Sequence, residues 1–366
     1  MKKIITFLFS FMLCFNLMFT TNADLYVDAA SSTQKAIITA SSTSLKSGRS
    51  SKYSTIKTLK KDATVNVIGY KGKWLKVTSN KKTGYISSKS AIITKEETTT
   101  SSVTLRKGPG SKYSQISKIG KNKKVYLISK SGNWSKIYYN NQIGYTSSKY
   151  LKGKYRICID AGHQSIGDTT KEPIAPGSST LKYKTSYGTS GTYTKIAEYK
   201  TTLAASKVLR DILQARGYDV IMVRDINGIK MSNVERAEFA NKNNCDLVFR
   251  VHTNWAEQSN IKGATIFVPA SNNKYVSSKE YKSICNPSYN LAKSINKNLK
   301  ADGIKMFGSE IYKTDNLTGF NWSKVPCVLF EMGFVSNKTD DYNVNKTSYQ
   351  KKFMNAVADG LDAYLK

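Results

Sequence analysis

The pattern of apolar positions divides the chain into two parts. Between about residues 33 and 152, short alternating runs such as TVNVIGY and KVYLISK are separated by Gly, Asn, Ser and Lys. Evenly spaced short strands with turn residues between them are typical of small all-β barrels. From Lys154 onward, strand-length apolar runs alternate with segments of helical period. This second part is predicted to be an α/β domain, a mostly parallel or mixed sheet with helices on both faces.

Local signals place the elements of the second part. Strands are expected at the apolar runs 155–160, 218–224, 246–251, 263–268 and 327–330. A helix is expected over 196–216, because Leu203, Leu209 and Leu213 share one face and Gly217 can cap its end. Ser232-Asn-Val-Glu235 is a capping box that should open a second helix, and a third helix is expected over about 277–301. The domain has about 210 residues, enough to bury a core.

A repeat of 60 residues runs through the first part. The matching pairs include Tyr53 with Tyr113, Trp74 with Trp134, and Gly84-Tyr85 with Gly144-Tyr145. Self-similarity at a fixed period indicates one structural unit used twice. We therefore expect two small barrels, at 33–95 and 98–152, each with its tryptophan as a core anchor. Thr98–Ser102 is expected to be a short Thr/Ser linker.

The start of the chain has the pattern of a secretory signal peptide. A basic start is followed by the apolar run 4–19, which is too short for a comfortable membrane span, and then by small and polar residues. Cleavage after Ala29, which removes residues 1–29, is preferred to cleavage after Ala23. The large residue before Cys14 argues against a lipid anchor. We expect a secreted protein with no stable membrane anchor.

Positive charge is concentrated in the first part. The chain has 57 Lys+Arg against 25 Asp+Glu, a net charge of +32. Residues 30–152 contribute 25 basic against 3 acidic side chains, and residues 153–366 contribute 30 against 20. On an exported protein, such charge favours an anionic cell-wall surface over nucleic acid as the partner. The alternative is that the lysines only form a solvated, solubilising face.

The cysteines do not suggest a metal site. Four follow the signal peptide, at positions 158, 245, 285 and 327, and no CxxC or Cys/His spacing occurs. Export permits disulfides, but most of these cysteines fall in or beside predicted buried strands, where a free thiol behaves as a small hydrophobe. Free core cysteines are the favoured interpretation.

The chain has only two histidines, and both directly follow predicted buried strands. His163 comes after 155–160 and the pair Ala161-Gly162, and His252 comes after 246–251. Ligand-binding groups gather just outside the carboxyl ends of parallel strands, so the two imidazoles can share a metal. The alternative is that each is a satisfied polar residue. A catalytic zinc site needs a third protein ligand and keeps a fourth position for water.

Glu198 is the best candidate for that third ligand. It opens the helix that follows His163, and a crossover helix can return its start to the sheet end where the preceding strand finished. The alternatives are an acidic residue favoured by the helix dipole, a surface salt bridge, or a solvated polar face. The pattern alone leaves these alternatives open.

The second barrel resembles a known domain. Its residues Leu105, Arg106, Gly108, Pro109, Tyr113, Trp134 and Gly144-Tyr145 are similar to the LRxGPxxxY…W…GY pattern of bacterial SH3 domains. The first copy departs from this pattern, with Leu45-Lys46-Ser47-Gly48-Arg49. The resemblance covers about residues 33–152 and implies a wall-targeting role, with the basic grooves around the tryptophans as the binding surface.

The second part resembles the zinc-dependent N-acetylmuramoyl-L-alanine amidases of the amidase-3 family. The motifs are DAGH ending at His163, Glu198 at a helix start, His252-Thr-Asn after a strand, and VLFEMGF around Glu331. The resemblance spans the domain predicted at 154–366. It implies that His163, Glu198 and His252 hold Zn²⁺ and that Glu331 is the catalytic carboxylate. Gln164–Lys195 is longer and richer in Tyr, Thr and Ser than expected. Two roles are open for this segment, a lid or a substrate groove.

The resemblance implies a secreted, cell-wall-associated peptidoglycan hydrolase. It would cleave the amide between N-acetylmuramic acid and L-alanine, with zinc activating water and polarising the carbonyl, and with Glu331 moving the proton. The alternative for Glu331 is a buried carboxylate paired with Arg or Lys. The alternative for the chain is a non-catalytic wall-binding or adhesive protein with an inactive amidase domain. A Cys/His endopeptidase is disfavoured, because no cysteine stands in a nucleophile-like motif ahead of a histidine.

Overall fold

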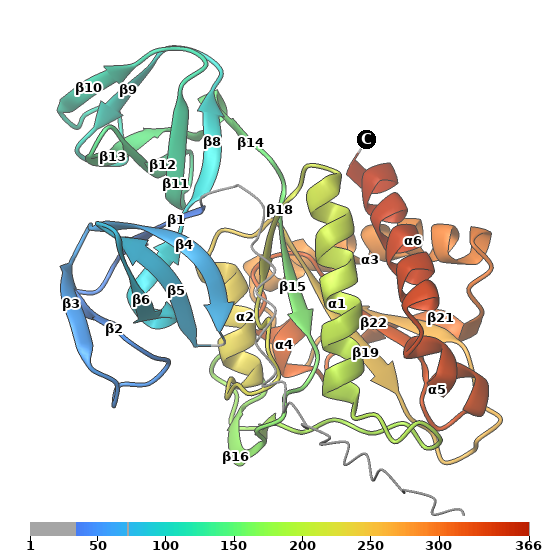
Figure 1. Ribbon diagram of the computed structural model, residues 1–366. Coiled ribbons are helices and arrows are strands. Elements are labelled where there is room, and N and C mark those ends of the chain that lie inside the picture. Colours follow the sequence, from blue (N-terminus) through green and yellow to red (C-terminus); the bar gives the residue numbers. More distant parts are fainter. Residues whose placement is uncertain (1–33, 72, 366) are drawn as a thin grey trace, which may run out of the picture. The chain divides into compact units, whose positions relative to one another are not determined.

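The computed structural model describes residues 34–71 and 73–365 (Figure 1). The predicted signal peptide, 1–29, lies outside the described residues. These described residues belong to one unit. None of the described helices combines the length and the apolar character that crossing a membrane requires.

The first repeat is a seven-stranded antiparallel sheet in the order β3-β2-β6-β5-β4-β1-β7. Its elements are β1 (Gln34–Ile38), β2 (Ser42–Lys46), β3 (Thr55–Lys60), β4 (Thr64–Lys71), β5 (Trp74–Ser79), β6 (Lys82–Ser87), the short 3-10 helix η1 (Ser88–Ser90) and β7 (Ala91–Ile93). The second repeat has the equivalent order β10-β9-β13-β12-β11-β8-β14. Its elements are β8 (Lys95–Thr99), β9 (Val103–Arg106), β10 (Gln115–Ile119), β11 (Lys124–Ser131), β12 (Trp134–Tyr139), β13 (Gln142–Ser147), η2 (Ser148–Tyr150) and β14 (Leu151–Gly153). The sequence repeat is therefore a repeat of structure.

The expected linker Thr98–Ser102 is wrong in its first two residues. Thr98 and Thr99 end strand β8, which pairs with β11 and β14 inside the second sheet. The polar sequence of β8 concealed this strand, because its inward positions are Lys95, Glu97 and Thr99, all buried. Lys95 is buried as an ion pair, with its Nζ 2.6 Å from Asp246 Oδ2.

Glycines of the repeat motif allow close packing in both barrels. A Cβ on Gly108 would lie 2.4 Å from the Tyr113 ring, and a Cβ on Gly144 would lie 2.7 Å from the carbonyl oxygen of Arg106. These contacts explain why the motif needs glycine at both positions. The interpretation of Trp74 and Trp134 as core anchors is wrong: both are only partly buried and lie outside the hydrophobic clusters of the barrels. Each begins a strand and stays partly open to solvent.

The second part contains a mixed six-stranded sheet in the order β18-β15-β19-β22-β20-β21. The strands are β15 (Arg156–Ala161), β18 (Asp219–Met222), β19 (Leu247–Asn254), β20 (Ala264–Pro269), β21 (Met306–Thr314) and β22 (Cys327–Phe334). All neighbours are parallel except β20 and β22. A separate hairpin of β16 (Asp168–Pro173) and β17 (Leu181–Thr185) lies within the long segment Gln164–Lys195. The cysteines at 158, 245, 285 and 327 are buried and free.

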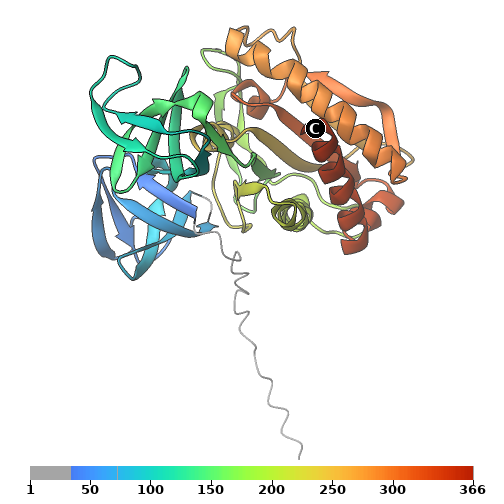
Figure 2. The same cartoon turned by 90° about the horizontal axis from the view of Figure 1, so that it is seen from above.

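Helices cover both faces of this sheet, as predicted. On one face lie α1 (Glu198–Ala215), α3 (Lys279–Ala301) and α6 (Thr347–Leu365), whose apolar sides form one cluster with the sheet. Figure 2 shows α3 in orange and α6 in red side by side, and the two helices are in contact. The other face carries α2 (Asn233–Lys242) and α4 (Thr318–Asn321), while α5 (Lys338–Val344) packs against β22. The predicted capping box at Ser232 and Glu235 is present.

The alternation of side chains along the strands decides which residues lie on each face of the sheet. Phe249 and Val251 of β19 point into the cluster under α1, α3 and α6. Arg250 and His252 lie on the opposite face because side chains alternate along a strand. Asp160 of β15 shares that face, where it meets Arg236 of α2. The sheet therefore presents charged side chains on one face at the carboxyl ends of its central strands.

Candidate metal centre

His163 ends a tight turn that follows β15. Its φ is +58°, in the left-handed region that is uncommon for residues other than glycine. The turn passes close to His252: a Cβ on Gly162 would lie 2.4 Å from the His252 ring. The His163 Nδ1 atom lies 3.2 Å from the carbonyl oxygen and 3.0 Å from the Oγ of Ser186, which leaves Nε2 facing Glu198. The segment Gln164–Lys195 thus returns to orient this ring.

Glu198 is the first residue of α1 and is 3 % exposed. Its Oε2 accepts a hydrogen bond from the amide of Thr189 at 2.9 Å, and its Oε1 accepts one from the amide of Thr253 at 3.1 Å. The same two oxygens lie 3.3 Å from His163 Nε2 and 3.3 Å from His252 Nδ1, respectively. This burial excludes a solvated face and a surface salt bridge for Glu198.

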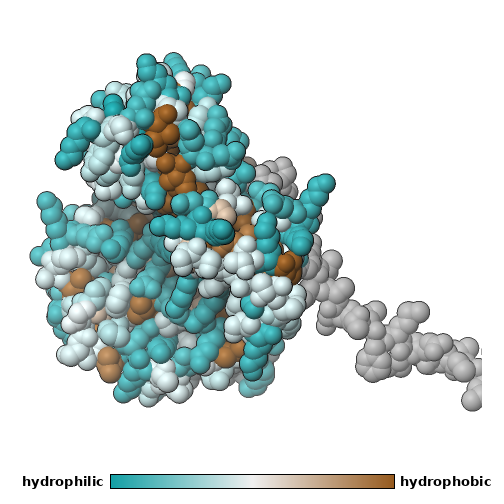
Figure 3. Space-filling model, turned by 90° about the vertical axis from the view of Figure 1, so that its left-hand side faces the viewer, coloured by the Kyte–Doolittle hydropathy of each residue, from teal (hydrophilic) through white to brown (hydrophobic). Residues whose placement is uncertain are grey.

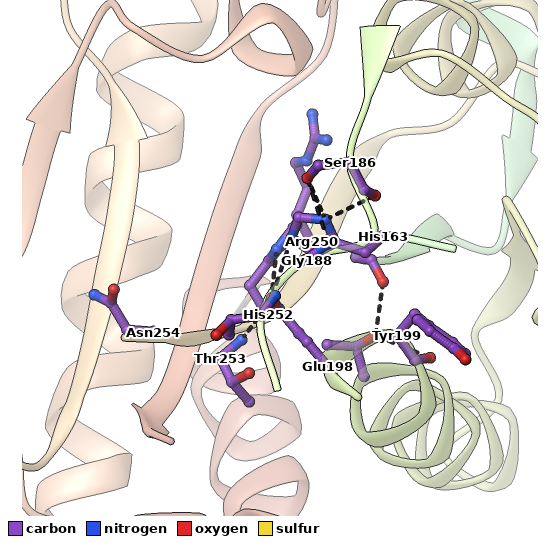
Figure 4. A network of polar contacts seen from close by, with 12 residues as sticks. His163, Ser186, Gly188, Glu198, Tyr199, Arg250, His252, Thr253 and Asn254 are labelled. Carbon is purple, nitrogen blue, oxygen red and sulfur yellow. Dashed lines mark hydrogen bonds and ion pairs between the residues drawn. The ribbon is translucent and has the colours of Figure 1, made fainter. Parts of the chain in front are cut away.

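The three predicted ligands come together. One ligand atom from each of His163, Glu198 and His252 lies within 4.8 Å of the others. Figure 4 shows the three side chains converging from the turn after β15, from α1 and from β19, with Ser186 and Gly188 beside them. A Cβ on Gly188 would lie 2.6 Å from Glu198 Oε2 and 2.7 Å from the His163 ring. The segment before α1 therefore closes tightly over the ligand atoms.

The protonation states fit a divalent metal. Burial lowers the pKa of His252 to about 4, so its imidazole is neutral at pH 7 and has a lone pair available. Burial on its own would raise the pKa of Glu198, but hydrogen bonds from His163 and His252 outweigh this effect and lower it below the usual range. His252 Nε2 has no hydrogen-bond partner among the described residues. Two imidazoles and one carboxylate match the donor set of a catalytic zinc site.

Glu331 stands beside this cluster on β22. It is directly opposite His252 on one neighbouring strand and Thr265 on the other, so the three side chains share a face. Its Oε2 atom is enclosed and has no partner, and none of the ion pairs of the described residues includes it. The alternative of a carboxylate paired with Arg or Lys is therefore wrong. Burial raises the pKa of Glu331 well above the usual range, and the negative charge of Glu198 adds to the shift.

A buried charge network lies under the site. Asp160 accepts from Arg236 at 2.5 Å and lies 3.1 Å from Arg250 Nη2. Burial would raise the pKa of Asp160, but the two guanidinium groups hold it below the usual range. Sequence reasoning missed both arginines and Ser186. The signal for Arg250 was present, since it is a charged residue inside the apolar run DLVFRV.

Comparison with known proteins relates both parts of the chain to known families. Residues 157–363 match the family model described as N-acetylmuramoyl-L-alanine amidase. Residues 41–91 and 101–152 each match the bacterial SH3 domain. Both matches fall on the units described above.

Individual relatives are distant. A protein of Buchnera aphidicola subsp. Baizongia pistaciae (strain Bp), provisionally named N-acetylmuramoyl-L-alanine amidase, is 25% identical over 57% of this chain and 95% of its own length. The Staphylococcus aureus protein named "Probable cell wall amidase LytH" is 24% identical over 54% of this chain, and the match spans 62% of that protein.

A solved structure has the same fold in the second part. The apo form of the N-acetylmuramyl-L-alanine amidase Ami1 from Mycobacterium abscessus aligns with 58% of this chain and 99% of its own, at a TM-score of 0.51 and 24% identity. The family match covers more than half of the chain. The chain therefore belongs to the N-acetylmuramoyl-L-alanine amidase family, and two bacterial SH3 domains precede its amidase domain.

Proposed function

We propose that this chain is a secreted, cell-wall-associated zinc enzyme that cleaves the amide between N-acetylmuramic acid and L-alanine in peptidoglycan. The observation that carries the proposal is the convergence of His163, Glu198 and His252 beside Glu331, whose Oε2 has no hydrogen-bond partner among the described residues. Two relatives are named as an N-acetylmuramoyl-L-alanine amidase and a cell wall amidase, and these names support the choice of substrate.

His163, Glu198 and His252 would hold the metal. When bound, zinc in such a site polarises a carbonyl and makes water a nucleophile near neutral pH. The protein holds the ligand side chains in fixed positions through hydrogen bonds. Ser186 orients the His163 ring, and the amides of Thr189 and Thr253 fix the two oxygens of Glu198. Ligands held in place by such hydrogen bonds do not have to reorganise when the metal binds.

Glu331 would act as the general base and then as the general acid. Its carboxyl neighbours His252 on the same face of the sheet, and its pKa is raised by burial and by Glu198. A raised pKa brings the carboxyl closer to the operating pH, which favours both taking a proton from the attacking water and giving one to the departing amine. Its free Oε2 is the atom that would carry this proton.

The rival proposal is a wall-binding protein with an inactive amidase domain. An inactive domain does not need metal ligands that are held in place. In this chain, all four polar residues of the family motifs are present, and the donor atoms of three of them converge. Digestion of purified peptidoglycan separates the two proposals. We expect new N-terminal alanine when the full chain is supplied with zinc. No release from several wall types would favour the rival.

Two glutamate variants test the assigned roles. Glu198→Ala should lower metal content together with activity, because it removes a ligand. Glu331→Ala should keep the metal and the fold but lose turnover by roughly 10²-fold to 10⁴-fold, the range for a general acid or base. Glu310→Ala, at an exposed ion pair with Lys300, is the matched control and should change neither. Metal loss in Glu331→Ala with full metal in Glu198→Ala would mean that the two roles are exchanged.

We also propose that the two SH3 domains bring the enzyme to anionic wall polymers. Residues 30–152 carry a net charge of +22. Figure 3 shows a predominantly hydrophilic face that is interrupted by a narrow hydrophobic band. Binding of the inactive Glu331→Ala chain to isolated walls should weaken as salt is added, because exposed charges are screened over about 8–10 Å at ordinary ionic strength. Binding that resists salt, or that is unchanged on walls stripped of anionic polymers, would contradict the proposal.

A further inference from the structure

Two buried arginines donate hydrogen bonds to the backbone of the turn that carries His163. All three carbonyl groups of the turn Ala161-Gly162-His163 accept hydrogen bonds from guanidinium groups. Arg236 of α2 donates from Nη1 to Ala161 at 2.9 Å and from Nη2 to His163 at 2.9 Å. Arg224, which follows β18, donates from Nε to Ala161 at 2.8 Å and from Nη2 to Gly162 at 2.8 Å. The backbone beside the candidate ligand therefore has no free carbonyl.

Arg224 also reaches the element that carries Glu198. The same Nη2 atom donates to the carbonyl of Tyr199, the next residue after Glu198, at 2.8 Å. The hydroxyl of Thr202, one turn further along α1, donates to the Gly162 carbonyl at 2.7 Å and accepts from Arg224 at 3.1 Å. One guanidinium thus connects the backbone next to two of the three candidate ligands. Figure 4 shows Tyr199 at the start of α1, directly below His163.

This arrangement is costly to the fold, which argues that it serves the site. Arg224 is 0% exposed, and none of its hydrogen bonds within the described part of the chain goes to a carboxylate. Burial lowers its pKa to about 9. A buried charge without a paired carboxylate destabilises a fold. Neutral donors can satisfy two or three carbonyls, but only a guanidinium offers five N–H groups in a fixed plane.

The turn needs such a brace for two reasons. His163 has a left-handed φ of +58°, which a non-glycine residue keeps only when its surroundings impose it. The turn also passes close to the second histidine, because a Cβ on Gly162 would lie only 2.4 Å from the His252 ring. Small shifts of either element would separate the ligand atoms, which now lie within 4.8 Å of one another.

We propose that Arg224 is a positioning residue of the metal centre: its guanidinium fixes the turn of His163 against the start of α1, and so sets the spacing of His163 and Glu198 before the metal arrives. This inference rests on the proposed function, because it takes those two residues as ligands. Arg224 itself touches neither metal nor substrate. It acts through the backbone on either side of them.

Arg224→Lys tests the proposal, with Arg156→Lys as its matched control. Arg156 lies at the opposite end of β15, is also 0% exposed and likewise donates to backbone carbonyl groups, those of Ile93, Thr94 and Asn243. Both variants lose a buried guanidinium, so both should lose stability. Affinity for Zn²⁺ is measured by chelator competition on folded full-length protein, and the visible spectrum of the Co²⁺-substituted protein reports the ligand geometry.

We expect Arg224→Lys to bind metal about 10–100-fold more weakly, the usual cost of losing a group that orients a ligand, and to alter the Co²⁺ spectrum. Arg156→Lys should keep the affinity and spectrum of the unchanged chain. Equal metal affinity in Arg224→Lys and the unchanged chain, or an equal loss in both variants, overturns the inference. If the unchanged chain binds no zinc, it is the proposed function that fails.

A milder variant covers the case in which Arg224→Lys does not fold. Thr202→Val keeps the shape of the side chain but removes the hydroxyl that joins the Gly162 carbonyl to Arg224. It should weaken metal binding in the same direction by a smaller factor, and Thr202→Ser should restore the affinity. Unchanged affinity in Thr202→Val would contradict the inference.

Discussion

The two ends of the central sheet differ in how completely their buried polar groups are hydrogen-bonded. At the amino end, Arg156 donates to Asp219 at 2.7 Å and to three carbonyl groups at 2.7–2.9 Å, and Asp246 accepts from Lys95 and from the Arg156 amide. At the carboxyl end, buried atoms of five side chains have no partner among the described residues: Arg250 Nε, His252 Nε2, Thr253 Oγ1, Thr265 Oγ1 and Glu331 Oε2. The same strands connect the two ends.

The difference separates structure from function within one sheet. A buried polar atom without a hydrogen-bond partner destabilises the fold by about 1–3 kcal/mol. Most buried polar atoms in native proteins therefore have partners. At the amino end, the buried charges of Arg156 and Lys95 are paired, and Glu97 Oε2 is the one charged-group atom without a partner among the described residues. More of the atoms without partners lie around His252 and Glu331, where the proposed function places a metal and a substrate amide. Substitutions should therefore reduce stability at the amino end, and metal binding or turnover at the carboxyl end.

The largest effect is expected at the amino end. Arg156→Met should lower the free energy of unfolding by about 3–5 kcal/mol, because it breaks a buried ion pair and leaves three carbonyl groups without donors. Urea unfolding measures this loss. Lys300→Met, which removes an exposed ion pair with Glu310, is the control and should change stability by no more than about 1 kcal/mol.

The zinc affinity of folded Arg156→Met should equal that of the unchanged chain. A parallel loss of metal binding would break the comparison, because it would show that the two ends of the sheet are not independent.

The sequence indicated most of the fold and the candidate ligands for a local reason. His163 and His252 each end an apolar run, and Glu198 opens an amphipathic helix, so strand period and helix starts bring them to one sheet edge. The role of Glu331 came from family resemblance, since pattern alone does not say which strands are neighbours. Its position beside His252 depends on the pairing of β19 with β22, whose residues are about 80 positions apart.

The remaining features depend on contacts that local patterns do not report. Ser186 and Arg224 act on His163 from 23 and 61 positions along the chain, and nothing in their neighbourhoods marks them. Strand β8 was missed because its buried positions are polar and satisfied by distant partners. Helix α6 is different: Phe353, Met354, Val357 and Leu361 have helical spacing, so the signal for this helix was available and unused.

A pair of glycines sharpens the comparison at the carboxyl end. Gly188 has φ +78° and Gly177 has φ +76°, so alanine is strained equally at both positions. A Cβ on Gly188 would lie within 3 Å of Glu198 and His163, whereas a Cβ on Gly177 meets nothing within 4 Å. Gly188→Ala should therefore weaken zinc binding about 10–100-fold beyond Gly177→Ala. Chelator competition measures both, and equal affinities would mean that the segment over the ligands does not set their spacing.

The smallest effect concerns the cost of leaving Glu331 unpaired. Burial raises the pKa of Glu331 in the folded protein, so between its unfolded value near 4.5 and the raised value the folded state binds more protons than the unfolded state. The stability that this proton contributes is present at low pH and is lost as the pH rises through the folded pKa. Glu331→Gln cannot ionise and should avoid this loss.

In metal-free protein, the unfolding free energy of Glu331→Gln should therefore exceed that of the unchanged chain by at least about 1 kcal/mol at pH 8, because each unit of raised pKa corresponds to about 1.4 kcal/mol, and by much less at pH 4, below the unfolded value. Urea unfolding at the two pH values measures the difference, in which the titration of His252 and of the other groups common to both chains cancels. Glu310→Gln, at a partly exposed side chain that is paired with Lys300, should show no such gain. If the gain at pH 8 is absent, Glu331 is satisfied in solution, and the contrast between the two ends of the sheet would not extend to its carboxyl group.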